Sequence, residues 1–441
     1  MMPPRRIALI SEHASPLARP GGVDSGGQNV YVTQLARELA AMGREVDVFT
    51  RRDAPDLPDV VSQRPGYRVI HVPAGPASPV RKEDLLPYMD EFASWMIRFA
   101  RRRPYDLTHA NFFMSAMVSG AIKAATGTPF VVTFHALGRV RRLHQKAADT
   151  FPEVRLAIED QAVLDADRII AECPQDVADL LKHYGADPSK LTTVPCGFDP
   201  AEFWPVARSK ARSRLNLPAS GPLLLQLGRM VPRKGVDTVI RGLARLQADH
   251  GIRARLLVVG GDSTEPDPTL TPEIGRLQAL AEAEGVADWV TFVGSRGRDV
   301  LRYYYAAADV FVTTPWYEPF GITPVEAMAC GTPVIGSDVG GIKATVVDGE
   351  TGYLVPPNDP EALADRLARL LGDPELLGKL GRQAHRRALA GYTWSGVARS
   401  IAAVYDEVAL GWGSAEVPST ARAGSARTTA TAASSGDWTA L

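Results

Sequence analysis

The chain has 441 residues, of which 45% are hydrophobic and 22% are charged, the composition of an ordinary globular protein. Because one hydrophobic core rarely grows past about 250–300 residues, this length predicts two domains. The 49 Lys and Arg residues and 50 Asp and Glu residues leave a net charge of -1, which excludes a protein that binds nucleic acid through a broad basic surface.

Cysteine content and apolar runs restrict the class further. Cys173, Cys196 and Cys330 are far apart and include no CxxC pair, so neither a disulfide framework nor a zinc site is expected. The N-terminal apolar run is short and leads directly into Ser11 and Glu12, which is typical of a first strand rather than of a signal peptide. No stretch reaches the ~18 apolar residues that span a membrane. We therefore expect a reduced, cytoplasmic protein.

The first half of the chain alternates short apolar runs with amphipathic stretches. Helices are predicted around 29–43 and 83–103, and strands are predicted at 5–11, 45–50, 68–73, 106–110, 129–134, 166–171 and 190–195. Such alternation is typical of parallel βαβ units. The segment 196–222, rich in Pro and polar residues, ends this series and is the predicted linker.

A second alternating series follows the linker. Its strands are predicted at 223–228, 255–261, 289–294, 309–314, 333–337 and 352–355, and its helices over 360–390 and 393–411. We therefore predict an α/β protein with domains at 1–203 and 204–385, a C-terminal helix at 386–411 and a tail at 412–441. The tail is predicted to be disordered, because 21 of the 29 residues from Gly413 to Leu441 are Ala, Ser, Thr or Gly and cannot form a core.

A glycine cluster lies in PGGVDSGGQNVYV at 20–32, between the first predicted strand and helix. Gly26 and Gly27 leave room for a ligand against the backbone, and the N-terminus of the following helix offers free N–H groups to an anion. The spacing matches neither GxGxxG nor the P-loop, so it favours neither NAD nor a P-loop nucleotide. The alternative is a flexible turn without function.

Two basic residues follow the first strand of the second series, in LGRMVPRKG. Arg229 and Lys234 lie where the carboxyl end of that strand is expected, and open α/β sheets bind ligands at this edge. A diphosphate is the natural partner of such a pair of positive charges. Two solvated bases on a loop remain the alternative.

Two carboxylates occur eight residues apart in EPFGITPVEAMACGTP. Glu318 is expected in a loop and Glu326 in a short helix. The backbone N–H groups of Phe320, Gly321 and Ile322 are expected at the mouth of that helix, where they can bind a phosphate or a sugar hydroxyl. The sequence TPVE also matches a capping box, so the alternative is that Glu326 only caps its own helix.

Three histidines, His13, His109 and His135, end predicted strands. Imidazoles at the ends of parallel strands meet at one edge of a sheet, where they suit hydroxyl or phosphate groups, although each alone could be structural. Their spacing matches no metal-binding signature, and no metal is expected. The amphipathic segment 81–103 has basic ends, but a net charge of -1 and no second anchor argue against membrane association.

Taken together, these motifs resemble those of the retaining glycosyltransferases of family 4, over residues 5–411. The most specific are the E-x7-E pair, Glu318 and Glu326, and GR-x4-K from Arg229 to Lys234. The resemblance implies the GT-B fold, in which two Rossmann-like, doubly wound domains face each other across a cleft and a C-terminal helix crosses back to the N-terminal domain. It also implies transfer of a hexosyl group from a nucleotide-sugar, with a UDP-sugar as the favoured donor, by front-face substitution without a metal or another cofactor.

The resemblance implies that the second domain binds the donor. Arg229 and Lys234 would bind the diphosphate and stabilise the departing nucleotide. Glu318 would bind hydroxyls of the donor sugar, together with the backbone N–H groups of residues 320–322. Glu326 would bind the ribose of the nucleotide.

The first domain would approach the diphosphate through Gly27 and would place His135 near the reacting centre, as a catalytic residue together with Glu318. Its segments are similar to two branches of the family, the sucrose-phosphate and sucrose synthases and the inositol 3-phosphate glycosyltransferases of mycothiol synthesis. The implied acceptor is a small sugar or polyol, with or without a phosphate, bound by His13, Asn29, Lys82 and Arg155. Phe112 and Ala136 depart from the inositol-phosphate branch, since each lacks a hydroxyl that binds phosphate there.

Two other functions stay open at this point. A non-catalytic sugar-nucleotide-binding protein would share the fold but would have lost a key site residue, and all of those named above are present. An NDP-sugar epimerase of the same two-lobed fold would not need the bases on the acceptor side. The sequence does not predict an oligomeric state.

Overall fold

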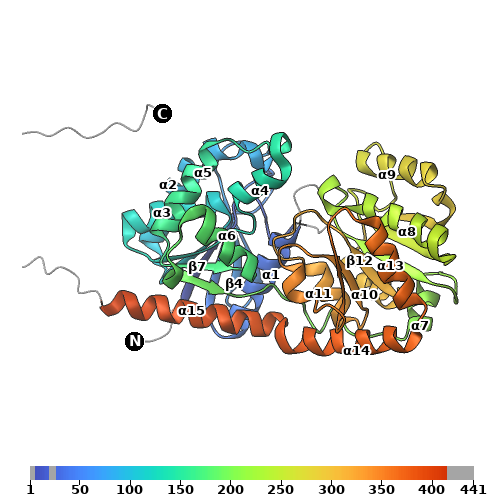
Figure 1. Cartoon of the computed structure of the whole chain (residues 1–441). Helices are drawn as coiled ribbons and strands as arrows, with labels where there is room; N and C mark the ends of the chain where they lie inside the picture. The colour runs from blue at the N-terminus through green and yellow to red at the C-terminus, as the bar shows by residue number, and fades with distance from the viewer. Residues whose placement is uncertain (1–4, 19–25, 415–441) are drawn as a thin grey trace, which may run out of the picture.

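In the computed structural model, which describes residues 5–18 and 26–414, the chain forms two α/β lobes side by side (Figure 1). Each lobe contains a sheet whose central strands are apolar on both sides, and helices cover both faces. The predicted α/β class with two doubly wound units is confirmed. The described residues leave out 1–4, 19–25, which overlaps the start of the glycine cluster, and 415–441, most of the predicted tail.

The first sheet has eight strands in the order β3-β4-β2-β1-β5-β6-β7-β8, and only the pair β3–β4 is antiparallel. Its strands are β1 (Arg6–Ile10), β2 (Glu45–Arg51), β3 (Val60–Arg64), β4 (Tyr67–Val72), β5 (Leu107–Asn111), β6 (Phe130–Thr133), β7 (Arg168–Ala171) and β8 (Leu191–Thr193). The sequence predicted all of these except β3, an edge strand whose mostly exposed residues lack an apolar pattern.

The second sheet has six parallel strands in the order β11-β10-β9-β12-β13-β14. They are β9 (Leu223–Leu227), β10 (Arg255–Val259), β11 (Val290–Gly294), β12 (Val310–Thr313), β13 (Val334–Ser337) and β14 (Gly352–Val355), all at predicted positions. In each sheet the strand order reverses once, between β1 and β5 and between β9 and β12. Open α/β sheets bind ligands at these switch points, outside the carboxyl ends of the strands.

The helices that cover the first sheet are α1 (Gly27–Ala41), α2 (Met89–Arg102), α3 (Phe113–Thr126), α4 (Gly138–Gln145), α5 (Val154–Asp165) and α6 (Pro174–Tyr184). Helix α2 begins later than the predicted start at 83. Two 3-10 turns, Lys82–Asp84 and Leu86–Tyr88, precede it, because Pro87 lacks an N–H and disfavours the α conformation at the residue before it.

The second lobe contains α7 (Arg208–Arg214), α8 (Val236–His250), α9 (Pro272–Ala283), α10 (Arg298–Ala307), α11 (Ile322–Ala329), α12 (Ile342–Thr345), α13 (Pro360–Leu371) and α14 (Pro374–Gly391). Helix α7 lies within the predicted linker. The first sheet ends at Thr193 and the second begins at Leu223, and the domain boundary at 203/204 stays a prediction.

The last helix, α15 (Trp394–Ser414), runs back along the first lobe beside α1 (Figure 1). Its Tyr405 hydroxyl lies 2.6 Å from Nδ1 of His109 in the first sheet. The helix extends three residues into the predicted tail at 412–441. Within the described ranges, no helix combines the length and hydropathy that a membrane crossing needs.

The predicted C-terminal helix at 386–411 is interrupted. Helix α14 ends at Gly391 and α15 begins at Trp394. The break follows from local capping, because Thr393 Oγ1 accepts a hydrogen bond from the N–H of Gly396 (3.3 Å) and thereby starts a new helix.

The two connections between the lobes are bonded to each other at this break. The N–H of Phe198 donates to the carbonyl of Tyr392 (2.8 Å), and the N–H of Trp394 donates to the carbonyl of Phe198 (3.0 Å). Gly197 permits this approach, since a Cβ there would lie 2.8 Å from the oxygen of Tyr392. A movement of one lobe relative to the other must therefore bend both connections together.

Candidate active site

A cavity of about 310 Å³ lies between the lobes, at the switch points of both sheets. The first lobe lines it with residues that include His13, Gly26, Gly27, Gln28, Asn29, Lys82, Phe112 and His135. The second lobe lines it with residues that include Arg229, Arg233, Lys234, Arg298, Glu318, Phe320, Gly321, Ile322 and Glu326. All residues that the sequence predicted for the site, except Arg155 and His109, therefore line this one cavity.

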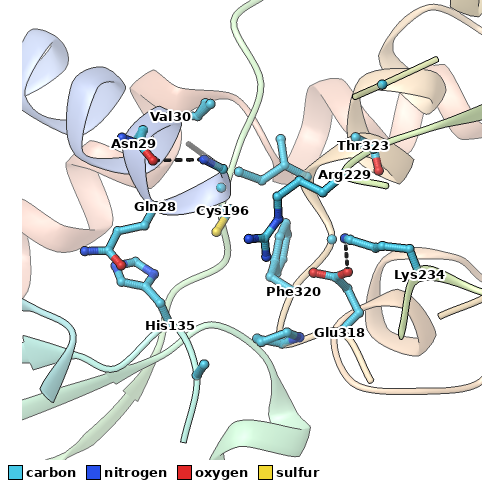
Figure 2. A pocket seen from close by; sticks show the side chains of 18 of the residues that line it. Gln28, Asn29, Val30, His135, Cys196, Arg229, Lys234, Glu318, Phe320 and Thr323 are labelled. Atoms are coloured by element: carbon cyan, nitrogen blue, oxygen red, sulfur yellow. Dashed lines mark hydrogen bonds and ion pairs between the residues drawn. The ribbon is translucent and has the colours of Figure 1, made fainter. Parts of the chain in front are cut away.

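The charged centre of the cavity is an ion pair between Lys234 and Glu318 (Figure 2). Lys234 follows β9 and Glu318 follows β12, so two strands that are neighbours at the switch point bring the pair together. Arg233 Nη1 lies 3.6 Å from the same carboxylate oxygen. Arg229 extends into the cavity beside them (Figure 2). Three cations thus surround one carboxylate, which leaves an excess of positive charge.

Burial and charge shift the pKa values of this pair. Burial lowers the pKa of Lys234 to about 8, with the carboxylate of Glu318 opposing the shift and the charge of Arg233 adding to it. Burial alone would raise the pKa of Glu318, but the charges of Lys234 and Arg233 outweigh burial and leave that pKa below its ordinary value. Glu318 is therefore ionised at neutral pH, and net positive charge remains for an anionic ligand.

Two glycines support the loop that holds Glu318. Gly340 has φ +47°, and a Cβ there would overlap the carbonyl oxygen of Glu318, while a Cβ on Gly341 would overlap the backbone of Phe320. The N–H of Gly341 donates to that same carbonyl of Glu318 (3.2 Å). Because only glycine allows this approach, the pair fixes the backbone of residues 318–320.

Helix α11 begins with Gly321 as its N-cap, so its N-terminal N–H groups lie at the cavity. The capping-box alternative for Glu326 is wrong, because Thr323 lies inside the helix. Glu326 instead accepts a hydrogen bond from the Tyr305 hydroxyl (2.9 Å) and pairs with Arg298 Nη1 (3.0 Å). Burial raises the pKa of Glu326, and the charge of Arg298 partly opposes that rise.

The N-terminus of α1 faces this cluster from the first lobe. A Cβ on Gly26 would lie 3.7 Å from Nε of Arg229, and a Cβ on Gly27 would lie 3.6 Å from Ile322. Asn29 fixes the turn, since its Oδ1 accepts a hydrogen bond from the N–H of Gly26 (2.9 Å; Figure 2). Both lobes therefore present a helix N-terminus to the same cavity, an arrangement that favours an anionic ligand.

His135 follows β6 at the edge of the cavity, with a φ of +57° that is unusual outside glycine. Its Nδ1 lies 3.0 Å from Glu172 Oε1 and its Nε2 lies 3.1 Å from Asn111 Oδ1. Asn111 Nδ2 donates to the carbonyls of Ile10 and His109 (3.2 Å each), which turns the amide oxygen toward the imidazole. Both ring nitrogens thus face side-chain oxygens, which fix the orientation of the ring.

His109 does not share this edge, contrary to the grouping of three histidines predicted above. It is fully buried inside β5, where its Nε2 lies 2.8 Å from Thr133 Oγ1 and its Nδ1 bonds to Tyr405 of α15. Burial, with the charge of His135 adding to it, lowers the pKa of His109 to about 3. This histidine is neutral and fastens the C-terminal helix to the first lobe.

Arg155, predicted to bind the acceptor, is 1% exposed and does not line the cavity. Its Nε donates to Glu159 (2.7 Å), and its guanidinium lies 4.9, 4.8 and 4.6 Å from the ring centres of Phe112, Phe113 and Phe151. The structure therefore does not bring Arg155 to the cavity, because matching single positions does not show which side chains pack over them. Phe112, which lines the cavity, packs over Arg155.

The polar residues of this region that the sequence analysis missed include Asn111, Glu172, Arg233 and Arg298. Three of them lie at or just after the carboxyl ends of β5, β7 and β11, the position that identified Arg229, so the same criterion applied to every strand would have found them. Arg233 directly precedes Lys234. Among residues 5–18 and 26–414, no three His, Cys, Asp or Glu side chains gather closely enough to hold a metal ion.

Two family models match the chain, one in each lobe. Residues 25–202 match the model described as Glycosyltransferase Family 4, and residues 207–387 match the model described as Glycosyl transferases group 1. The gap between the two matches lies in the segment that connects the sheets.

Relatives and solved structures agree with these matches. D-inositol 3-phosphate glycosyltransferase 2 of Catenulispora acidiphila is 40% identical over 409 residues, 91% of this chain and 95% of that protein. The D-inositol 3-phosphate glycosyltransferase of Acidothermus cellulolyticus is 39% identical over 409 residues, 91% and 90% of the two chains. The sucrose-phosphate synthase of Thermosynechococcus elongatus superposes with a TM-score of 0.85 at 36% identity, over 92% of this chain and 100% of that one. The chain therefore belongs to glycosyltransferase family 4, and it is a glycosyltransferase of the GT-B fold.

Proposed function

We propose that this enzyme transfers a hexosyl group from a UDP-sugar to a hydroxyl of a small sugar or polyol, with retention of the anomeric configuration. The observation that carries the proposal is the convergence of Arg229, Lys234 and Glu318 with the N-terminus of α11 in one cavity between two lobes. Cations and helix N–H groups bind a diphosphate, and a buried carboxylate beside them binds sugar hydroxyls.

The donor diphosphate is bound, in this proposal, by Arg229 and Lys234 and by the N–H groups of residues 320–322, with Gly27 approaching from the other lobe. Negative charge grows on the diphosphate as the glycosidic bond breaks, so fixed cations stabilise the transition state more than the ground state. Because the charge is met by side chains and helix termini, the proposed reaction requires no metal.

The donor sugar lies, in this proposal, between Glu318 and His135. Glu318 is ionised and accepts hydrogen bonds from sugar hydroxyls. The imidazole of His135, held by Glu172 and Asn111, lies at the opposite edge of the cavity. We assign no covalent nucleophile, and propose that the acceptor attacks from the face that the diphosphate leaves.

The acceptor is proposed to bind beside the first sheet, among His13, Asn29, Lys82 and Phe112, which line the cavity. The relatives are named for a phosphorylated polyol, D-inositol 3-phosphate. Arg155 lies behind Phe112 here, so Lys82 and the cavity-lining Arg141 are left to meet an acceptor phosphate. The cytoplasmic location expected from the sequence stays a prediction.

The donor site is tested by the melting temperature of the wild type and of Arg229→Ala with UDP, GDP and ADP. A ligand at 100 times its dissociation constant stabilises the native state by about 2.7 kcal/mol. We expect UDP to raise the melting temperature of the wild type and not of Arg229→Ala. Arg276→Ala, which removes an exposed arginine of α9 that pairs with Glu273, is the control that keeps the response. A wild type that responds to none of the three nucleotides contradicts the donor site.

Transfer itself is tested by UDP release from UDP-glucose and UDP-N-acetylglucosamine in the presence of D-inositol 3-phosphate or inositol. We expect release that requires an acceptor, an α-configured product by NMR, and a rate about 100-fold to 1000-fold lower in Glu318→Ala. Conversion of the donor without an acceptor would identify an epimerase. Binding without any turnover would identify a sugar-nucleotide-binding protein, and an unchanged rate in Glu318→Ala would remove the role of that residue.

A further inference from the structure

Arg298 lines the cavity but matches none of the motifs that identified the donor site. We propose that Arg298 orients Glu326, the carboxylate expected above to bind the donor's ribose, donates to the same vicinal diol, and fastens this contact to the connection between the lobes. The inference rests on the proposed function, since it assumes that a nucleoside diphosphate occupies the cavity.

The guanidinium of Arg298 is held on three sides. Nη1 lies 3.0 Å from Glu326 Oε1, Nε donates to Glu202 Oε2 (2.9 Å), and the group lies 5.0 Å from the ring centre of Phe203. A planar group with fixed donors on several edges is suited to linking two carboxylates at once. Its orientation is therefore set before any ligand enters.

This pairing leaves polar capacity unused in the part of the chain that the structure describes. Arg298 Nη2 is buried without a hydrogen-bond partner there, and Glu326 Oε1, which pairs with Arg298 Nη1, keeps a second lone pair, whereas Glu326 Oε2 accepts from Tyr305. A spare acceptor lone pair beside an unused donor matches a vicinal diol, in which one hydroxyl donates and the other accepts. Both residues line the cavity, so a ribose placed there satisfies both atoms.

Glu202 connects this contact to the first lobe. It lies in the segment between the two sheets, and its Oε1 accepts a hydrogen bond from Gln34 of α1 (3.4 Å). Helix α1 also presents Gly27 to the cavity. A continuous series of side-chain contacts therefore runs from Glu326 through Arg298 and Glu202 to helix α1, and links the proposed ribose contact to both lobes.

Charge also favours this assignment. The groups that face Glu326 are Arg298 and Tyr305 from α10, Glu202 from the connection, and Cys330 from the end of α11. Burial raises the pKa of Glu326, and Arg298 is the cation that opposes the rise. Removal of Arg298 therefore favours protonation of Glu326, and a protonated carboxyl is a weaker acceptor for a ribose hydroxyl.

The test compares UDP with 2′-deoxy-UDP by calorimetry at pH 7.5, or the equivalent GDP or ADP pair if one of those binds instead. We expect the wild type to prefer the ribonucleotide by about tenfold. Arg298→Ala then weakens UDP by about tenfold or more and 2′-deoxy-UDP by less than about threefold, so that the preference disappears. Arg298→Lys keeps a positive charge but not the planar guanidinium. We expect its preference for UDP over 2′-deoxy-UDP to lie between those of the wild type and of Arg298→Ala.

The matched control is Arg302→Ala, one turn further along α10. Arg302 lies 4.3 Å from the ring centre of Trp204 in the same connection, much as Arg298 lies over Phe203. Among the described residues, Arg298 pairs with Glu326 and Arg302 does not. We expect its preference for UDP to equal that of the wild type. Glu202→Gln, which keeps the shape of the second anchor and removes its charge, weakens UDP by about threefold.

Several results would overturn the inference. The first is that Arg298→Ala keeps the wild-type preference for UDP over 2′-deoxy-UDP. The second is that Arg298→Ala loses affinity for both nucleotides equally, which would indicate a general structural role. If Arg298→Ala does not fold, Arg298→Lys and Glu202→Gln must still reduce the preference for UDP, and unchanged preference in both rejects the assignment. A wild type that binds none of the nucleotides instead refutes the proposed function, and the inference with it.

Discussion

The two walls of the cavity use their charges differently. On the second lobe, Arg229 and Lys234 point at the space where a ligand would lie. On the first lobe, buried charges are satisfied within the lobe: Arg155 by Glu159, and Glu12 by His13 and Ser115. We infer that donor binding depends more strongly on salt than acceptor binding, which combines the charges of Lys82 and Arg141 with shape, an aromatic wall and hydrogen bonds.

The walls also differ in where backbone strain is placed. On the second lobe, the positive φ values at the site belong to glycines such as Gly235 (+66°) and Gly321 (+91°). On the first lobe they belong to Phe112 (+90°) and His135 (+57°), for which such values cost energy. Surrounding packing must hold those two side chains in place. For Phe112, the ring of His13 packs against it with the two ring centres 5.0 Å apart.

The largest expected effect tests whether the charges of the first lobe are structural. Glu159→Ala leaves Arg155 buried without its partner, so we expect a loss of about 3–5 kcal/mol in the free energy of unfolding. Asp160→Ala is the control, since Asp160 pairs with Arg139 on the surface, and there we expect less than about 1 kcal/mol. Chemical denaturation measures both, and equal losses would contradict the distinction.

The second prediction tests the electrostatic character of the donor wall. Lys234, whose pKa burial lowers to about 8, must be protonated to bind a diphosphate through its charge. Affinity for UDP is therefore full below pH 8 and falls above it, by up to about tenfold for each pH unit. Lys234→Arg keeps its charge at high pH. The titration of UDP affects both proteins alike, so the ratio of the wild-type affinity to the Lys234→Arg affinity reports the titration of the lysine alone. A constant ratio from pH 7 to 9.5 would refute the assignment.

The smallest expected effect concerns the aromatic wall. Phe112→Ser removes the ring that covers Arg155, whose Nη1 has no hydrogen-bond partner among the described residues. We expect the KM for D-inositol 3-phosphate to fall by about threefold to tenfold, because a charged donor becomes accessible to the phosphate. The KM for inositol, measured alongside, is expected not to fall. An equal rise for both acceptors would show instead that the ring itself binds the acceptor.

Sequence reasoning predicted best which residues meet at the cavity where their segments follow strand ends. Arg229, Lys234 and Glu318 line the cavity together because their segments follow buried strands, and parallel strands bring such segments to one edge. It did less well where a role depends on which side chain covers another. Glu326 matched a capping box, yet helix α11 starts before Thr323 and frees the carboxylate for Tyr305 and Arg298.

The sequence by itself determined the alternation of strands and helices, the two sheets and the residues at their switch points, because apolar periodicity and glycine placement are local properties of the chain. Only the tertiary structure decided that Arg155 is closed off behind Phe112, that His109 fastens α15, and that Arg298 connects Glu326 to Glu202. Each of these depends on side chains far apart in the sequence meeting in a buried space. There, packing and the cost of an unpaired charge select the partner.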